Sequence, residues 1–422
     1  MKKLFVTMAL AFVAATGMAV AQNSNITLED IWTKRTFAPR GIGSVRSMAD
    51  GEHYLSMTRT GIAKYSYATG EKVEDICLFG GPAVGRQAKP LPPMESYEMS
   101  ADEQKILLSA GFEPLYRHSG VSDYYIYDVQ DKSFTKISNS GKQRLTTLSP
   151  DGTKVAFVRD NNLYWMDLGT LEEYAITTDG RLNEIIYGTT DWVYEEEFAI
   201  TQGFQWSPDS KKIAYYRFDE SKVREYNMQT WGALYPEDYR YKYPKAGEDN
   251  SKVQLCVYNV EQGKNLYLPA LVSYRTDLSK WEYIPRFQWT NDADVLAFMV
   301  MNRLQNQMQI VTLNVAEGHK AFVLYEEECD TYVEVPDTWK FLTVGTGKKA
   351  KDMMLLTSER DGYRHIYLYG MDGKLVKQVT TGGYEICDIC GVDAANQRLY
   401  YTSREDGATN KRLYMTTFDG KK

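Results

Sequence analysis

A turn followed by two β-strands recurs along this chain, and the repetition constrains the fold more than any other feature. The clearest copy runs from Leu148 to Leu168 (LSPDGTKVAFVRDNNLYWMDL). Its Asp-Gly step suits a tight turn, because both residues tolerate the backbone angles that such turns require. An apolar strand, a short polar gap and a second strand follow, and successive side chains of each strand point to opposite faces.

Six further copies can be aligned with this one. WSPDSKKIAYYRF repeats its first half from Trp206, and WTNDADVLAFMVMNRLQNQMQIVTL repeats the whole from Trp289. Weaker copies begin near Ala49, Ser100, Gly347 and Ala394, and successive turns are roughly 50 residues apart except between Asp209 and Asp292. A period of this size with several strands per unit is typical of propeller blades, whereas a two-sheet sandwich would not need so many similar units.

We therefore predict an all-β fold, a β-propeller of about seven to eight four-stranded blades. The composition agrees, because the 32 tyrosines favour half-buried strands and apolar stripes of helical period are scarce. The net charge is −7 with both signs interspersed, and no basic block would follow a phosphate backbone. Nucleic acid is not an expected partner.

The first 21 residues have the pattern of a secretory signal peptide. Lys2 and Lys3 precede an apolar run from Leu4 to Val13, and small residues around Ala21 suit cleavage there. The run is shorter than the roughly 20 residues that a membrane anchor needs. We expect the mature chain, residues 22–422, to be exported to the periplasm or the extracellular space.

A long insertion separates the copies that begin at Trp206 and Trp289. Residues 225–251 (EYNMQTWGALYPEDYRYKYPKAGEDNS) are aromatic and punctuated by proline. Long loops are usually functional or disordered, and aromatic residues argue against disorder because they gain from burial. The segment is interpreted as an inserted arm that docks on a second subunit.

The five cysteines are too few and too scattered for a disulfide framework. Cys387 and Cys390 form a C-x-x-C in a strand-like run, without the second such pair that a zinc site would need. We favour a structural role over metal or redox chemistry, and a local disulfide remains open in an oxidising compartment. No metal or cofactor is expected.

The most informative segment is DWVYEEEF, which begins at Asp191. Asp191 suits the cap of a short helical turn, whose positive end favours the acidic residues that follow. Three consecutive carboxylates (Glu195, Glu196 and Glu197) between aromatic residues repel one another unless they share a cation. Without its context such a triplet would usually be a solvated surface.

DWVYEEEF resembles the signature of the propeller domain in the dipeptidyl peptidase IV branch of the prolyl oligopeptidase family (S9). WSPDSKKIAYYRFDES, YPKAGEDNS and DGYRHIYLY extend the resemblance over the mature chain. It implies that Glu196 and Glu197 hold the free amino terminus of a peptide substrate. LYRHSGVSDYYIYDV resembles the segment whose arginine, here Arg117, contacts a substrate carbonyl; a lone arginine would otherwise be an ordinary ion-pair partner. A Phe-Arg pair of the family has no match near Val335 to Leu342.

The physical chemistry agrees with this implied role. An enzyme that removes dipeptides must recognise an ammonium and measure two residues from it. Each carboxylate within about 4 Å of the ammonium contributes roughly 4 kcal/mol at an effective dielectric of 20, before desolvation is subtracted. Blocked amino termini lose this attraction.

The family performs acyl transfer with a Ser-Asp-His triad on an α/β-hydrolase domain that follows the propeller, with its serine in G-x-S-x-G. No G-x-S-x-G occurs in the sequence, and repeat-like strands continue to Tyr414. We therefore expect no catalytic residue and no α/β-hydrolase domain in this chain, a propeller that is incomplete in its last blades, and no peptide hydrolysis by the chain alone. A hydrolase domain on another chain is the expected partner.

Two other functions remain open from the sequence. One is a non-catalytic propeller that binds peptide amino termini or partner proteins. The other is a different enzyme class with its active site inside the propeller, such as a glycosidase that uses paired carboxylates. No second acidic cluster with a matching context supports the glycosidase.

Overall fold

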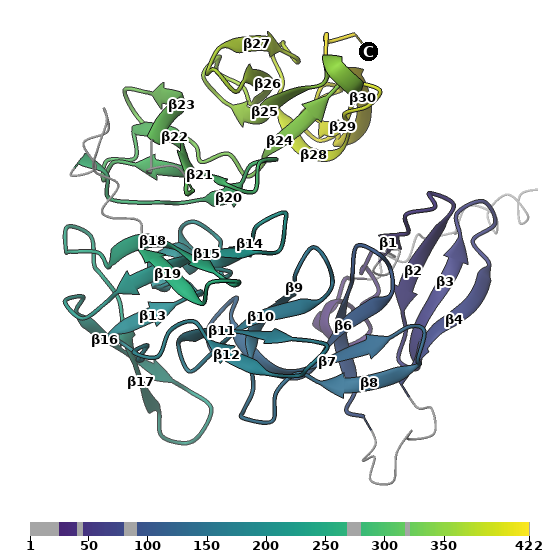
Figure 1. Cartoon of the computed structure of the whole chain (residues 1–422), viewed down its shortest axis with the longest axis vertical. Helices are drawn as coiled ribbons and strands as arrows, with labels where there is room; N and C mark the ends of the chain where they lie inside the picture. Colours follow the sequence, from purple (N-terminus) through teal and green to yellow (C-terminus); the bar gives the residue numbers. More distant parts are fainter. Residues whose placement is uncertain (1–24, 40–44, 80–90, 268–279, 317–320, 422) are drawn as a thin grey trace, which may run out of the picture. The chain divides into compact units, whose positions relative to one another are not determined.

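The computed structural model describes residues 25–39, 45–79, 91–267, 280–316 and 321–421, so the predicted signal peptide lies outside the described residues. Within these ranges antiparallel strands form seven small sheets and one two-stranded hairpin (Figure 1). The helices there are η1 (Glu29–Thr33), α2 (Trp192–Glu196) and η3 (Gly347–Lys349). The predicted all-β class is confirmed. None of these helices is long and apolar enough to cross a membrane.

The chain divides into two compact units. The described residues up to 56, together with 64–72, form the first unit, and residues 57–63 belong with those from 73 onward. In the first unit the ring of Tyr54 packs against those of Tyr65 and Tyr67, at centroid distances of 5.4 and 4.9 Å. The first sheet has the order β1 (Arg46–Ser47), β2 (His53–Met57), β3 (Gly61–Ser66) and β4 (Lys72–Leu78).

Six more sheets follow in the second unit. The second sheet contains β5 (Met94–Met99), β6 (Lys105–Pro114), β7 (Gly120–Asp128) and β8 (Ser133–Lys136), and the third contains β9 (Arg144–Leu148), β10 (Lys154–Arg159), β11 (Asn162–Asp167) and β12 (Glu173–Ala175). The fourth has the order β13 (Ile185–Tyr187), β15 (Lys212–Asp219), β18 (Lys252–Asn259) and β19 (Lys264–Tyr267), with β14 (Phe204–Trp206) also paired to β15.

The last three sheets are simple meanders. The fifth contains β20 (Phe287–Trp289), β21 (Val295–Met301), β22 (Gln307–Asn314) and β23 (Ala321–Glu328). The sixth contains β24 (Trp339–Val344), β25 (Lys351–Ser358), β26 (His365–Gly370) and β27 (Leu375–Gln378). The seventh contains β28 (Ile386–Asp393), β29 (Arg398–Ser403) and β30 (Arg412–Thr417). Four strands per sheet is therefore the commonest number but not a constant one.

Each of the seven turns predicted from the repeat lies between the first two strands of a sheet, or between β14 and β15 in the fourth. In the clearest copy, Ser149 Oγ donates to Asp151 Oδ1 at 2.6 Å and accepts from Lys154 N at 3.0 Å. The turns that begin at Ser100 and Ser207 make the same pair of hydrogen bonds. A local Ser-x-Asp pattern thus sets the same turn in three sheets.

From the second sheet to the seventh, the sheets pack face to face with their neighbours along the chain. On β10, Val155 and Phe157 belong to a core shared with the second sheet, while Ala156 and Val158 belong to a core shared with the fourth. Because side chains alternate between the two faces of a strand, one apolar run supplies both cores. Both faces of the sheet are covered by neighbouring blades, and the predicted β-propeller is confirmed with seven blades.

The largest of these cores joins the fourth, fifth and sixth sheets. It contains buried residues of all three, among them Tyr216, Phe298 and Leu356. Val193 and Tyr194 of α2 belong to the same cluster. The short helix that carries the glutamate triplet is therefore anchored in the main core.

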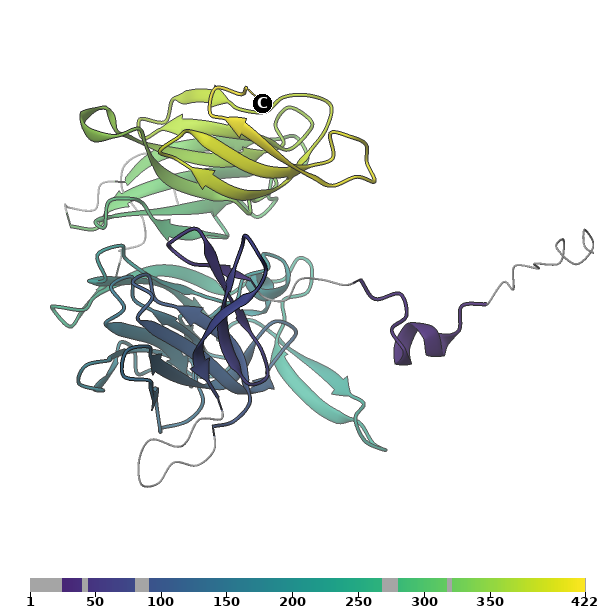
Figure 2. The same ribbon diagram turned by 90° about the vertical axis from the view of Figure 1, so that its right-hand side faces the viewer.

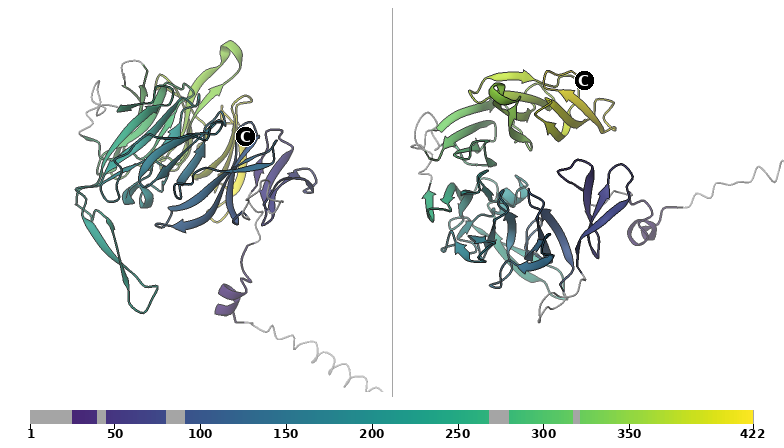
Figure 3. Two further views of the ribbon diagram at one scale, coloured as in Figure 1. Left: turned by 60° about the horizontal axis from the view of Figure 1, so that its bottom comes forward. Right: turned by 45° about the vertical axis from the view of Figure 1, so that its right-hand side comes forward.

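The predicted arm is a β-hairpin. Strands β16 (Glu225–Thr230) and β17 (Glu237–Lys242) pair along their full length, and every residue of β16 is exposed. The hairpin extends away from the fourth sheet in the two side views (Figure 2; Figure 3, left).

The C-x-x-C pair lies in β28, where Cys387 is half-buried and Cys390 is exposed. Each of these cysteines falls at a shift in the register with β29. All five cysteines are free in the structure.

Candidate functional site

Asp191 fixes the start of α2, as the sequence predicted. Its side chain accepts a hydrogen bond from Tyr194 N at 3.0 Å, which caps the helix, and a second from Ser251 Oγ at 2.6 Å. Burial raises the pKa of Asp191 to about 6, although these hydrogen bonds act in the opposite direction. Residue 251 is the last residue of the insertion, so the cap also ties the end of the insertion to α2.

The three glutamates that follow have different surroundings. Glu195 is buried, and its Oε1 accepts a hydrogen bond from His118 N at 2.8 Å. Glu196 is half-buried, whereas Glu197 is exposed. Successive residues of a helix point about 100° apart, so neighbouring side chains face different parts of the molecule. Glu195 therefore has a structural partner, and of the two residues named by the resemblance only Glu197 is exposed.

Glu196 and Arg117 lie together. The Arg117 Nε atom is 3.0 Å from Glu196 Oε1, and the side chains are 66% and 13% exposed respectively. This distance suits an ion pair, but the oxygen is shielded from solvent and accepts no properly aligned hydrogen bond from the residues described. The structure thus brings two of the three predicted residues into contact and leaves a buried carboxylate oxygen with unused bonding capacity.

The turn that carries Arg117 is held from two sides. Tyr116 in this turn accepts a hydrogen bond from Trp192 Nε1 at 3.0 Å, which ties it to α2. Tyr239 on the arm donates from its hydroxyl to Leu115 O at 3.3 Å. The β6–β7 turn, α2 and the arm therefore form one connected structure around the Arg117–Glu196 pair.

Comparisons with known proteins identify the family of the chain. The family model described as dipeptidyl peptidase IV (DPP IV) N-terminal region matches residues 100–422. The chain belongs to this family. The family predicted from the DWVYEEEF motif is thereby confirmed.

Similar proteins include the dipeptidyl peptidase 4 of Porphyromonas gingivalis, whose crystal structure matches with a TM-score of 0.82 and 36% identity over 94% of this chain and 55% of that one. The dipeptidyl peptidase 4 of Trichophyton equinum is 28% identical over 76% of this chain and 42% of its own length. That of Arthroderma otae is 28% identical over 77% of this chain and 42% of its own length. The chain thus spans less than half the length of these curated relatives.

An aromatic residue that lies near Glu197 in this DPP IV N-terminal region was not predicted from the sequence. Tyr332 lies between β23 and β24, and burial raises its pKa, with Glu334 and then Glu197 adding to the effect. It is therefore close enough to Glu197 to feel its charge. Nothing in the local sequence could have indicated this, because the two residues belong to different blades.

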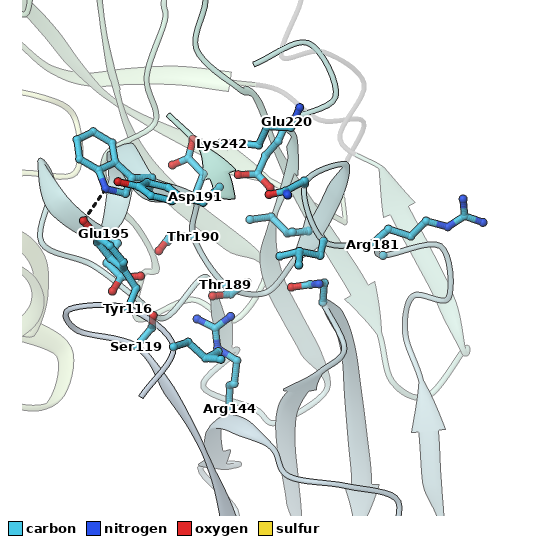
Figure 4. A pocket seen from close by; sticks show the side chains of 18 of the residues that line it. Tyr116, Ser119, Arg144, Arg181, Thr189, Thr190, Asp191, Glu195, Glu220 and Lys242 are labelled. Carbon is cyan, nitrogen blue, oxygen red and sulfur yellow. Dashed lines mark hydrogen bonds between the residues drawn. The ribbon is translucent and has the colours of Figure 1, made fainter. Parts of the chain in front are cut away.

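A cavity of about 700 Å³ lies beside α2 (Figure 4). Glu195 and Asp191 line it, together with Arg144, Glu220 and Lys242. Arg117, Glu196 and Glu197 are not among its lining residues. The DPP IV motif thus supplies both the glutamate that pairs with Arg117 and one wall of a separate cavity, which was not predicted from the sequence.

Proposed function

We propose that this chain recognises the free amino terminus of peptides for a serine exopeptidase of the dipeptidyl peptidase IV type, which releases amino-terminal dipeptides. The observation that carries the proposal is the buried Oε1 atom of Glu196, which lies beside Arg117 without an aligned hydrogen bond. An incoming ammonium would be attracted by the Glu196 carboxylate.

The neighbouring residues suit the rest of the peptide terminus. The exposed carboxylate of Glu197 supplies a second negative charge next to Glu196. Arg117 is two-thirds exposed, so its guanidinium keeps donors for a peptide carbonyl. When fixed groups hold the amino terminus of a peptide substrate, they limit how many of its residues lie before the reacting bond. This accounts for the release of two residues.

The reaction itself is proposed to use a Ser-Asp-His triad on a hydrolase domain supplied from outside these 422 residues. The curated relatives are more than twice as long as the matched region, which leaves room in them for such a domain. The N-terminal sequence supports export, so we propose that recognition takes place outside the cytoplasm.

Cleavage of a chromogenic Gly-Pro substrate tests the proposed division of recognition and catalysis between this chain and a hydrolase domain. The purified chain is expected to be silent alone and to support cleavage when mixed with a separately expressed hydrolase domain of the family. The Glu196→Ala/Glu197→Ala double variant should lose the supported activity, because the ammonium then has no carboxylate partner. Cleavage by the chain alone would refute the proposed division.

A second copy of this chain is the proposed partner of the arm. Near the hairpin tip Trp231, Leu234 and Tyr235 are 73%, 89% and 79% exposed. Exposed apolar side chains on a hairpin with free strand edges are typical of an interaction surface. Two identical arms can cover each other about a twofold axis, as in most homodimers.

A further inference from the structure

The cavity beside α2 is built by elements that are far apart in the sequence. Its walls come from the β6–β7 turn, the start of β9, the β10–β11 turn, the segment before β13, α2, the residue after β15 and strand β17 of the arm. Its volume of about 700 Å³ lies within the range of small-molecule sites, roughly 300–1,000 Å³. Two of its lining side chains, the basic Arg144 and the acidic Glu220, come from different walls.

Arg144 provides the positive group. It is the first residue of β9 and is partly buried. Its Nε atom is shielded from solvent without a partner. Burial lowers the pKa of Arg144, and Glu195 partly offsets this, so the guanidinium stays charged. The planar guanidinium fork matches a carboxylate with two parallel hydrogen bonds.

Glu220 provides the acidic group. It follows β15 and is only 6% exposed. Burial and the neighbouring Asp191 raise the pKa of Glu220 to about 8, while Lys242 acts in the opposite direction. The Nζ atom of Lys242 donates instead to Val223 O at 2.7 Å. A buried carboxyl group that is protonated near neutral pH ionises more readily when an ammonium lies beside it.

We propose that this cavity binds a small zwitterion whose carboxylate pairs with Arg144 and whose ammonium pairs with Glu220. Arg144 and Glu220 enter the cavity from different elements, whereas Arg181 extends away from the other labelled side chains (Figure 4). A zwitterion carries one group for the basic side chain and one for the acidic side chain. That the ligand is a free dipeptide rests on the proposed function, because an enzyme of this type releases dipeptides. The cavity would then be a second site, distinct from Glu196 and Glu197, that senses the product.

Binding of Gly-Pro to the Glu196→Gln/Glu197→Gln variant, followed by calorimetry, tests the site separately from amino-terminal capture. We expect saturable binding in this background. Adding Arg144→Gln should weaken it about 10- to 100-fold, which is what the loss of a charge-assisted hydrogen bond corresponds to. Arg181→Gln is the matched control, because Arg181 lines the same cavity but is 74% exposed and lies 3.8 Å from Glu184, so binding should be unchanged.

Modified ligands test both ends without changing the protein. Acetyl-Gly-Pro lacks the ammonium and Gly-Pro amide lacks the carboxylate, so each should bind at least about tenfold more weakly than Gly-Pro. Equal affinity for all three ligands, or unchanged affinity after Arg144→Gln, would overturn the proposal. Absence of any Gly-Pro binding to the Glu196→Gln/Glu197→Gln variant would also overturn the proposal. Recognition of the peptide amino terminus by the unaltered chain is tested by a separate assay.

Discussion

Neighbouring residues with the same side chain can have separate roles when a helix turns them toward different surroundings. Glu195 is buried and bonded to the His118 backbone, whereas Glu196 meets Arg117 and Glu197 is exposed. The sequence motif indicated carboxylates that share a cation, but it could not show which of them already had a partner inside the protein. That distinction depends on His118, which is 77 residues from Glu195.

Asp191 is predicted to be necessary for the local structure of α2. Asp191→Ala leaves Tyr194 N and Ser251 Oγ without their acceptor, and should lower the free energy of unfolding by about 0.5–2 kcal/mol. Urea unfolding measures the change. Asp191→Asn retains an acceptor oxygen and should cost less; equal losses in the two variants would show that the cap is not the cause.

Glu220 is predicted to make stability depend on pH. Its pKa is raised to about 8, against an ordinary value near 4.3, so the folded state holds a proton that the unfolded state has lost. The free energy of unfolding therefore falls as the pH rises from the lower of these two pKa values to the higher. The facing groups Asp191, Asp219 and Lys242 contribute to the shift.

Glu220→Gln removes this titration. Relative to the unaltered protein, the variant should be more stable at pH 9 than at pH 5, by an amount on the order of a few kcal/mol in urea unfolding. Glu184→Gln is the control, because the Glu184 side chain is 56% exposed and should show no such trend. An unchanged difference between pH 5 and pH 9 for Glu220→Gln would contradict the burial argument.

At the scale of elements, the turns were predictable and the arm was predictable in part. Ser-x-Asp turns are set by residues within five positions of one another, so their pattern is visible in the sequence. The aromatic insertion indicated an ordered arm, but not that Tyr239 would reach Leu115, which is 124 residues away. Contacts of this kind depend on how the blades are arranged rather than on local sequence.

The arm is predicted to control association. Replacing Trp231 and Leu234 with serine removes two of the most exposed apolar side chains of the hairpin, and should convert a dimer into a monomer in sedimentation velocity. Leu304→Ser is the matched control, because Leu304 is 77% exposed in a turn between β21 and β22. A monomeric unaltered protein would contradict the proposed role of the arm.

At the scale of the whole molecule, the repeat indicated the blades because each blade uses the same alternation of side chains. It could not indicate the cavity beside α2, because Arg144 and Glu220 are 76 positions apart and neither belongs to a recognisable motif. The cavity also depends on the arm, which interrupts the repeat. A site that forms where an insertion interrupts the repeat is therefore difficult to predict from the sequence.

The shared cores are predicted to couple the stability of neighbouring blades. Phe298 is fully buried in the core that joins the fourth, fifth and sixth sheets. Phe298→Ala should cost about 3–5 kcal/mol through lost burial and the cavity it leaves. Hydrogen exchange should then accelerate in β15 and β25 as well as in β21; acceleration confined to β21 would show that the blades unfold independently.

The central claim is that this chain recognises a free peptide amino terminus through Glu196 and Glu197. Its most direct test is calorimetric binding of a Gly-Pro-containing tetrapeptide amide, with and without amino-terminal acetylation, to the unaltered chain and to the Glu196→Gln/Glu197→Gln variant. The account predicts that only the free peptide binds the unaltered chain and that the variant binds it at least about tenfold more weakly. Equal affinity for the free and acetylated peptides, or no effect of the double substitution, would contradict the claim.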